Sequence, residues 1–278
     1  MNVGIIGAGA MGAMLVRAHS RYAGDNSAVI RVANRSAAPL EALKADVPGL
    51  RTGTPEEVTA SADVLILCLP AGPYIGAAAA LAALLRPDAV FVCISSGVSL
   101  EDLSTLMPNP IIRLVPNVAH QVGRGVALVI PGPRASTEQI EKVCSFMRPF
   151  SRPMLVGEAD VRIATDICSC GPAIVACLAQ LLATSSAANA RGLAVDEIQQ
   201  MCVETLAGVG ALLDDSYSLT CIVDAVATHG GTTEAALCVL RSRIPAVMQE
   251  LHHATREREQ WLRAQRPGLG NESARASV

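Results

Sequence analysis

The sequence predicts an α/β domain with a doubly wound, mostly parallel sheet, followed by an all-α region. In residues 2–157, short apolar runs alternate with stretches of helical periodicity, which is typical of parallel strands joined by crossover helices. From Glu158 onward the strand patterns disappear and long helical runs follow one another. At 278 residues the chain exceeds the usual size of one core, which also favours two domains.

The elements follow in a regular order along the chain. Residues 2–6, 11–22 and 28–33 are predicted as strand, helix and strand, forming one βαβ unit. Further strands are predicted at 64–69, 89–94, 111–115, 126–130 and 154–157, and helices at 55–60, 74–85, 100–106, 136–150, 158–191, 194–214, 219–227 and 232–264. We therefore expect a first domain over 1–157, a helical domain over 158–265 and a disordered tail over 266–278.

Composition argues against several classes of protein. Charged residues make up 17% of the chain, aromatic residues 3%, and the net charge is −3, so no nucleic-acid partner is expected. The nine cysteines lie in apolar segments without CxxC spacing, and we interpret them as reduced core residues with no metal site. The chain begins with a predicted strand and not a signal sequence, so we expect a cytoplasmic protein.

One stretch invites comparison with a membrane-spanning helix. No charge falls between Asp166 and Arg191, but polar residues and Pro172 interrupt the run. We therefore expect no membrane span. The stretch is interpreted as a helix buried on most sides at a subunit interface.

Three glycines at the end of the first strand predict a dinucleotide site in a Rossmann domain. Gly7 permits the tight turn, Gly9 lets the backbone approach a pyrophosphate, and Gly12 permits close packing of helix on strand. Ala10 and Met11 open the following helix, whose amides and dipole favour an anion. The alternative is a glycine-rich turn that holds no ligand.

The end of the second strand indicates which dinucleotide binds. An acidic residue there would accept hydrogen bonds from the ribose of NAD, whereas this chain has Asn34, Arg35 and Ser36. A guanidinium with two small polar neighbours suits a 2′-phosphate, so NADPH is the expected cofactor and NAD the alternative. Arg35 could instead be a solvated turn residue.

Five motifs in order resemble those of the pyrroline-5-carboxylate reductases. The resemblance runs from Met1 to about Glu259, and its last three motifs are far more specific than the glycine motif. The motifs are GIIGAGAMG at 4–12, ANRS at 33–36, RLVPNVAHQVGRG at 113–125, CGPA at 170–173 and HGGTTEAAL at 229–237.

The resemblance implies the reduction of a cyclic imine, Δ1-pyrroline-5-carboxylate, to proline by hydride transfer from NAD(P)H. It also implies proline biosynthesis as the role, and an interlocked helical homodimer that can assemble further. By the resemblance, Asn117 lies close to the nicotinamide, and Leu69 and Pro70 follow the strand that borders the cofactor.

The same resemblance assigns the substrate site to the GGTT segment. Thr233 would hydrogen-bond the ring nitrogen as the catalytic residue, with Thr228, Gly231 and Thr232 near the carboxylate. Elementary physics agrees, because the free amides and dipole at a helix start attract a carboxylate. The alternative is that the threonines only cap the helix.

Lysines are confined to Lys44 and Lys142, so the helical region has none. Related β-hydroxyacid and 6-phosphogluconate dehydrogenases place a lysine on the long helix that starts the second domain, to handle the alcohol proton. The absence of such a lysine argues against a dehydrogenase that acts on an alcohol. A protonated imine already carries its activating proton, so positioning and a hydroxyl suffice.

Several positions depart from the family pattern. Leu69 stands where a lysine is common, Cys170 and Ile174 lie in the altered SGSGPAY motif, and His229 replaces a proline. A paralogue that reduces another imine in secondary metabolism, or a non-catalytic dinucleotide-binding regulatory protein, is therefore the alternative.

The remaining histidines and a pair of aspartates complete the candidates. His229 and His120 could each serve in proton transfer or be structural. We expect surface positions for His19, His252 and His253. Asp214 and Asp215 are expected to form a helix C-terminal turn, and the alternative places them near the amine end of the substrate.

Overall fold

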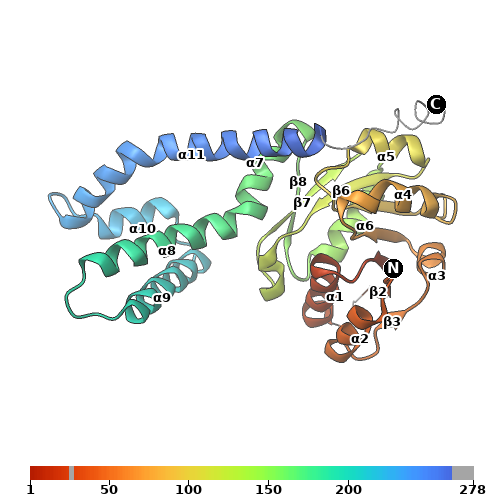
Figure 1. Ribbon diagram of the computed structural model, residues 1–278, viewed down its shortest axis with the longest axis horizontal. Helices are drawn as coiled ribbons and strands as arrows, with labels where there is room; N and C mark the ends of the chain where they lie inside the picture. Colours follow the sequence, from red (N-terminus) through yellow and green to blue (C-terminus); the bar gives the residue numbers. More distant parts are fainter. Residues whose placement is uncertain (25–27, 265–278) are drawn as a thin grey trace, which may run out of the picture. The chain divides into compact units, whose positions relative to one another are not determined.

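The computed structural model describes residues 1–24 and 28–264 (Figure 1). Its contacts divide the chain into two compact units. Among the described residues, the first unit contains residues up to 169 and residues 256–264, and the second contains residues 170–255. The predicted tail at 266–278 lies outside the described residues.

The first unit is built on one sheet of eight strands in the order β3-β2-β1-β4-β5-β6-β7-β8. All neighbouring strands are parallel except β6 and β7, which confirms the doubly wound, mostly parallel α/β fold. The strands are β1 (Asn2–Ile6), β2 (Val29–Ala33), β3 (Arg51–Thr52), β4 (Val64–Leu67), β5 (Val90–Cys93), β6 (Ile111–Val115), β7 (Val126–Pro131) and β8 (Arg152–Leu155).

The helices of this unit cover both faces of the sheet. Val64 and Ile66 of β4 belong to one core cluster, whereas Leu65 and Leu67 belong to the other, because successive side chains point to opposite faces. The two buried faces explain the continuous apolar run of such strands. The first cluster includes residues of α1 (Ala10–Tyr22), α2 (Ala37–Asp46) and α6 (Thr137–Met147); the second includes residues of α3 (Pro55–Ser61), α4 (Ala71–Ala82) and α5 (Leu100–Leu106).

One strand and one α-helix were not expected from the sequence. The strand β3 has only two residues, Arg51 and Thr52, and neither makes an apolar run. Of the ten residues of α2 only Leu43 is buried, so its apolar periodicity is weak. Both elements are stabilised by their neighbours in the sheet and core rather than by their own pattern.

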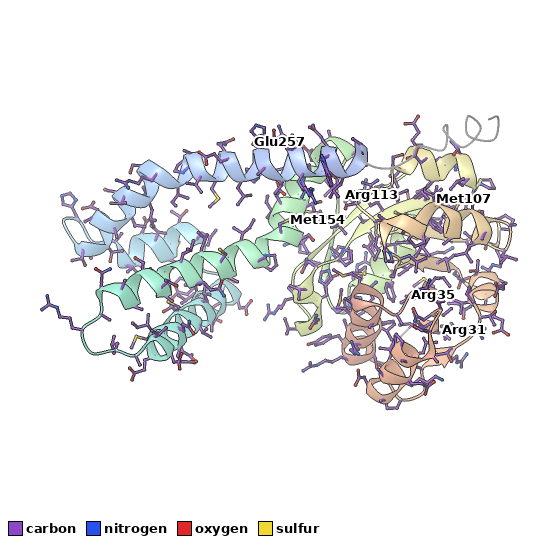
Figure 2. All side chains as sticks on the ribbon, viewed as in Figure 1. Arg31, Arg35, Met107, Arg113, Met154 and Glu257 are labelled. Atoms are coloured by element: carbon purple, nitrogen blue, oxygen red, sulfur yellow. The ribbon has the colours of Figure 1, made fainter. Side chains whose placement is uncertain are left out.

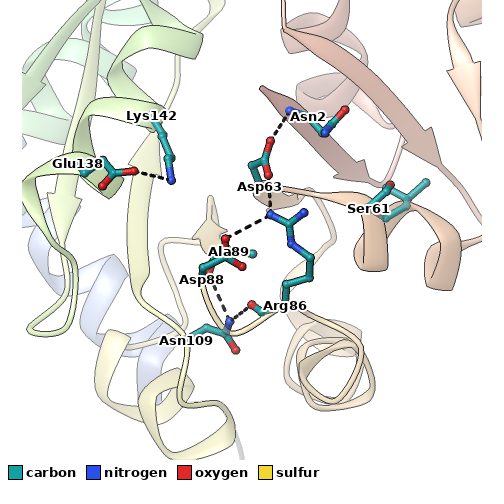
Figure 3. A network of polar contacts seen from close by, with 10 residues as sticks. Asn2, Ser61, Asp63, Arg86, Asp88, Ala89, Asn109, Glu138 and Lys142 are labelled. Carbon is teal, nitrogen blue, oxygen red and sulfur yellow. Dashed lines mark hydrogen bonds and ion pairs between the residues drawn. The ribbon is translucent and has the colours of Figure 1, made fainter.

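A polar network fastens the amino ends of the central strands (Figure 3). Asp63 accepts the N–H of Asn2 at 2.7 Å and pairs with Arg86 at 2.6 Å, and Asn109 donates to the carbonyls of Arg86 and Ala89 at 2.7 and 3.3 Å. The amide of Asn2, and then Arg86, hold the pKa of Asp63 below its usual range. This network lies at the amino ends of the strands, whereas the glycine turn lies at their carboxyl ends, so its role is structural.

A cluster of two histidines and two phenylalanines joins α1 and α6 to the 3-10 helix η2 (Val118–Val122). The His19 ring packs edge-on against Phe146, and the His120 and Phe146 rings both pack edge-on against Phe150. The surface position expected for His19 is wrong, because only 3% of the residue is exposed. Its Nε2 accepts the N–H of Ala28 at 3.1 Å.

The long helical run predicted at 158–191 is interrupted. Asp166–Cys170 form a π-helical turn immediately before α8, in which Pro172 occupies the first turn and cannot donate to the carbonyl of Cys168. The order is η3 (Glu158–Asp160), α7 (Val161–Thr165), η4 (Asp166–Cys170), α8 (Gly171–Asn189), α9 (Val195–Asp214), α10 (Leu219–Val226) and α11 (Thr232–Ala264). Asp214 ends α9 and Asp215 is its C-cap, so the helix-end assignment of this pair is confirmed.

The start of this region still belongs to the first unit. Val161 of α7 packs in one cluster with Leu128 and Ile130 of β7. Arg162 pairs with the buried Asp166 at 2.7 Å and lies 3.6 Å from Glu259, near the end of α11. The contacts therefore divide the chain inside the π-helical turn, twelve residues after the boundary expected from the sequence at 157/158.

The second unit exposes much of its apolar surface. Within α8 only Ala183 is buried, and Leu181 and Leu182 are each 61% exposed in the single chain. Burial of this helix at a subunit interface stays a prediction. Three cysteines of this unit are exposed in the single chain, so their assignment to the core is wrong: Cys177, Cys221 and Cys238.

In the described part of the chain, one helical run, residues 158–189, is long and apolar enough to cross a membrane by length and composition. Only 6% of its most apolar window is buried in the chain. An apolar face of this size is stable when lipid or another protein surface covers it.

The burial of His19 predicts acid sensitivity of the first unit. Desolvation lowers the pKa of His19 to about 4, below the value of about 6.5 in the unfolded chain. The unfolded state therefore takes up a proton first, and stability is lost as the pH falls from 6.5 towards 4, by ~2 kcal/mol between pH 7.5 and 5.0.

Urea unfolding of His19→Gln at these two pH values measures the effect, and we expect a smaller loss than in the wild type. The stability of His19→Gln should still depend on pH to some extent, because burial also lowers the pKa of His120. The exposed His253, changed to Gln, is the control. An unchanged pH dependence in His19→Gln would contradict the assignment.

Candidate functional site

The glycine turn between β1 and α1 is shaped by close contacts with β4. Gly7 has φ of +106°, and a Cβ there would overlap the carbonyl oxygen of Cys68. A Cβ at Gly12 would overlap the carbonyl oxygen of Gly7. By contrast, apart from Gly9 itself and its neighbours in the chain, no heavy atom of the described residues lies within 4 Å of the place where a Cβ of Gly9 would be. Packing explains Gly7 and Gly12, whereas Gly9 leaves room for a ligand beside the backbone.

The first turn of α1 presents backbone amides beside this open side. The first intrahelical bond runs from the N–H of Ala13 to the carbonyl of Gly9 at 2.9 Å, so the amides of Ala10, Met11 and Gly12 lie ahead of the helix ladder. Gly9, Ala10 and Met11 are exposed. These donors and the helix dipole suit a pyrophosphate group.

Asn34 fastens the loop after β2 to the glycine turn. Its Oδ1 accepts the N–H of Ala8 at 3.0 Å, and its Nδ2 donates to the carbonyl and the hydroxyl of Ser36 at 2.9 and 3.2 Å. The polar atoms of Asn34 are thus committed to the protein. Arg35 is exposed and forms no ion pair with any described residue, so its guanidinium is available to a phosphate.

The segment after β4 borders the same turn. A Cβ on Gly7 would lie 3.2 Å from Cδ2 of Leu69, and the exposed Pro70 caps α4. Desolvation, with a smaller contribution from Cys93, raises the pKa of Cys68 to about 12. Cys68 is therefore a protonated packing residue and not a nucleophile.

The loop after β6 is held by the buried side chain of Asn117. Its Nδ2 donates to the carbonyl of Val126 at 2.8 Å, and its Oδ1 accepts the N–H of Ala119 at 3.0 Å. Gly125 has φ of +88°, and a Cβ there would meet Oδ1 of Asn117 at 2.9 Å. Asn117 therefore shapes the loop, and its backbone is what remains to contact a ligand.

His120 lies in this loop but faces the core. It is fully buried, and its Nδ1 lies 2.9 Å from the carbonyl oxygen of Arg124. Burial lowers the pKa of His120, although the bond to Arg124 acts in the opposite direction. A buried neutral ring packs and does not exchange protons with a substrate, so we assign His120 a structural role.

Arg113, at the start of the RLVPN motif, is a buried residue whose role the sequence did not indicate. Only 1% of it is exposed, its Nη2 donates to the carbonyl of Val98 at 2.7 Å, and its Nη1 lies 3.9 Å from Oε1 of Glu158. Arg113 thereby links β6 to the loop after β5 and to η3. Burial of an arginine was not detectable from residue type, because arginines are mostly exposed.

In the second unit, the predicted substrate residues surround the start of α11. Gly231 donates its N–H to the carbonyl of Thr228 at 2.9 Å, and the first helical bond runs from Ala235 to Gly231 at 3.2 Å. The amides of Thr232 and Thr233 lie ahead of that bond, in the first turn. Thr232 is exposed and Thr233 is half-buried.

A carboxylate that the sequence analysis did not single out lies in the same turn. Oε2 of Glu234 accepts the N–H of Gly230 at 2.7 Å, and Oε1 lies 3.4 Å from Nδ1 of the fully exposed His229. An acidic residue three positions into a helix is a common capping signal and could have identified Glu234. The start of α11 therefore carries its own negative charge beside the first-turn amides.

The candidate residues thus form two groups, one in each unit. In the first unit, the glycine turn, Asn34, Leu69 and Pro70 lie together at the carboxyl ends of β1, β2 and β4, where ligands bind in open parallel sheets. In the second unit, Thr228, Gly231 and the two threonines gather at the start of α11. Among the described residues, no group of three or more potential ligands could hold a metal ion.

Two family profiles match the chain, one in each half. Residues 2–97 match the family described as NADP oxidoreductase coenzyme F420-dependent, and residues 158–262 match the family described as pyrroline-5-carboxylate reductase dimerisation. The first match contains the glycine turn and Arg35, and the second contains all of the second unit. Together they support binding of a nicotinamide dinucleotide and association of the chain with its own copies.

Two curated proteins of Bacillus subtilis (strain 168) are similar to the chain over most of its length. ComE operon protein 4 is 27% identical over 256 residues, which is 91% of this chain and 92% of that protein. Pyrroline-5-carboxylate reductase 3 is 24% identical over 265 residues, which is 95% of this chain and 97% of that protein.

The fold is also that of a solved member of the same family. A pyrroline-5-carboxylate reductase from Coxiella burnetii gives a TM-score of 0.85 at 23% identity, over 94% of this chain and 98% of that one. The profiles, the relatives and the fold agree with the motifs of the sequence. Residues 158–262 belong to the pyrroline-5-carboxylate reductase dimerisation family, and the chain as a whole is similar to pyrroline-5-carboxylate reductases in sequence and fold.

Proposed function

We propose that the chain is an NADPH-dependent reductase of a cyclic imine, with Δ1-pyrroline-5-carboxylate as the first substrate to test and L-proline as its product. The observation that carries this proposal is the open glycine turn of the first unit, and the hydroxyl- and amide-bearing start of α11 in the second unit supports it separately. Similarity to pyrroline-5-carboxylate reductases supports the same assignment.

The proposed role of each residue in cofactor binding, substrate binding or hydride transfer follows from its chemistry. The first-turn amides of α1 would hold the pyrophosphate, and Arg35 the 2′-phosphate. The bound nicotinamide supplies a hydride, with its electron pair, to the imine carbon. The hydroxyl of Thr233 would hydrogen-bond the ring nitrogen, and the amides of Thr232 and Thr233 would orient the carboxylate.

The availability of Arg35 supports NADPH over NADH. Neither Asn34 nor Ser36 carries a negative charge that would repel a 2′-phosphate. The donors of Asn34 are occupied by Ser36, so Arg35 would carry most of the preference. NAD is the alternative cofactor.

The exposed apolar faces of the second unit support a homodimer. Leu181 and Leu182 of α8 and Val203 of α9 are each more than half exposed, and they lie inside the segment that matches the dimerisation family. A second copy would bury such faces, and higher assemblies could be built from the dimer. We accordingly propose a cytoplasmic oligomer in which α8 contacts protein, not lipid.

Glu234 favours one alternative, a reductase of an imine without a carboxylate. Its carboxylate already lies at the start of α11 and bonds to Gly230. Two anions in the same turn would repel each other, which would weaken the binding of a carboxylated substrate. A paralogue for another imine in secondary metabolism would accommodate this charge. A non-catalytic dinucleotide-binding regulatory protein is the remaining alternative.

A comparison of two substrates tests the proposal directly. NADPH oxidation by the purified chain should occur with Δ1-pyrroline-5-carboxylate, and Glu234→Gln should lower KM for it by about tenfold by removing one negative charge. The uncarboxylated Δ1-pyrroline is the control. Faster turnover of this control by the wild type would favour the paralogue. Oxidation with neither imine, despite NADPH binding, would favour the regulatory protein.

Arg35→Ala tests the cofactor assignment. Loss of the guanidinium should raise KM for NADPH about tenfold or more and leave KM for NADH nearly unchanged, because only NADPH carries the 2′-phosphate. Steady-state kinetics with both dinucleotides measures this, with the exposed Arg21→Ala as the control. Equal effects on both dinucleotides would remove Arg35 from the phosphate site.

Thr233→Ala tests the assignment of the catalytic hydroxyl. A hydrogen bond to a charged nitrogen contributes about 1.5–3 kcal/mol, so single-turnover hydride transfer should slow by about 10- to 100-fold. NADPH affinity should not change. Thr205→Ala, at an exposed threonine of α9, is the matched control. An unaltered rate would exclude Thr233 from the mechanism.

A further inference from the structure

Two arginines stand side by side at the edge of the sheet. Arg31 of β2 and Arg51 of β3 are partners in the parallel register. The side chains of such partners project from the same face of a sheet, with the strands about 4.8 Å apart. Because Val32 belongs to the opposite core, this face is the one that α3 covers. Arg31 is labelled in Figure 2.

Like charges directly opposite each other on neighbouring strands repel and are destabilising. Elsewhere in this unit arginines have carboxylate partners, as in Arg17–Asp46, Arg86–Asp63 and Arg148–Glu141. Neither Arg31 nor Arg51 forms an ion pair with any residue in the two described ranges. The repulsion between them is therefore not offset by the chain itself.

The two side chains line a hollow of about 670 Å³ between the sheet edge and α3. Its polar lining includes Thr52, Ser61 and Glu57. The carboxylate of Glu57 caps α3 by accepting the N–H of Thr54 at 3.0 Å, so it is directed at the helix start. A volume of this size fits a small-molecule ligand.

We propose that this hollow is an anion site for a small phosphate-bearing ligand, held between the guanidinium groups of Arg31 and Arg51. Planar guanidinium groups bind phosphate oxygens with two parallel hydrogen bonds, and a doubly negative group would neutralise both charges. Thr52 and Ser61 add hydroxyl groups to the lining.

The site is separate from the one proposed for the dinucleotide. None of its lining residues belongs to the glycine turn or to the loop of Asn34, Arg35 and Ser36. A second possible role of the arginines, protection of an edge strand against pairing with other chains, requires no ligand. Only an anion site predicts that the protein binds a phosphate-bearing ligand and is stabilised by it.

Isothermal titration with inorganic pyrophosphate tests the proposal on the full chain saturated with NADP⁺. The wild type should bind pyrophosphate under these conditions. Arg31→Gln and Arg51→Gln should each weaken binding about tenfold or more, whereas Arg21→Gln on α1 should not. Saturation with NADP⁺ occupies the dinucleotide site. Absence of pyrophosphate binding would therefore count against the anion site alone, whereas absence of imine reduction would count against the proposed function alone.

Thermal unfolding supplies a second readout that does not depend on activity. Without pyrophosphate, Arg51→Gln should have a Tm equal to or above that of the wild type, because the substitution relieves repulsion. The rise in Tm on adding pyrophosphate should be lost in this variant. Absence of binding to the wild type, displacement by NADP⁺, or equal weakening in Arg21→Gln would each overturn the proposal.

Discussion

The close approach of β1, α1 and β4 at the glycine turn is the constraint on which the rest of the first unit depends. Gly7 lies against the carbonyl of Cys68, and Gly12 against the carbonyl of Gly7, at distances that no Cβ could occupy. The approach sets the start of α1 at the carboxyl end of the sheet. It therefore decides where free amides point, and with them the position of any phosphate.

Polar side chains maintain this geometry from both edges of the sheet. Asn34 and Asn117 fasten loops at the carboxyl edge, while Asp63 and Asn109 fasten strands and loops at the amino edge. Each bond satisfies a backbone group that would otherwise be buried or strained without a partner. The asparagines that border the candidate site thus act by positioning the backbone, whereas the side chain of Arg35 is exposed.

The second unit, unlike the first, leaves many apolar side chains exposed. Its helices expose leucines and valines to solvent, and the segment matches a dimerisation family. An apolar surface of this kind is stable when another surface covers it. At the start of α11, Thr232 and Thr233 lie in the same turn as the carboxylate of Glu234.

Periodicity and motif order were enough to predict the fold class, the seven longer strands and the family, because a buried parallel strand and a glycine turn each require particular residue types. The tertiary structure alone decided that His19 and Arg113 are buried, that Asn34 bonds to Ala8, and that α8 is exposed in the single chain. It also paired Arg31 with Arg51. These facts depend on contacts between residues distant in sequence, which no local pattern encodes.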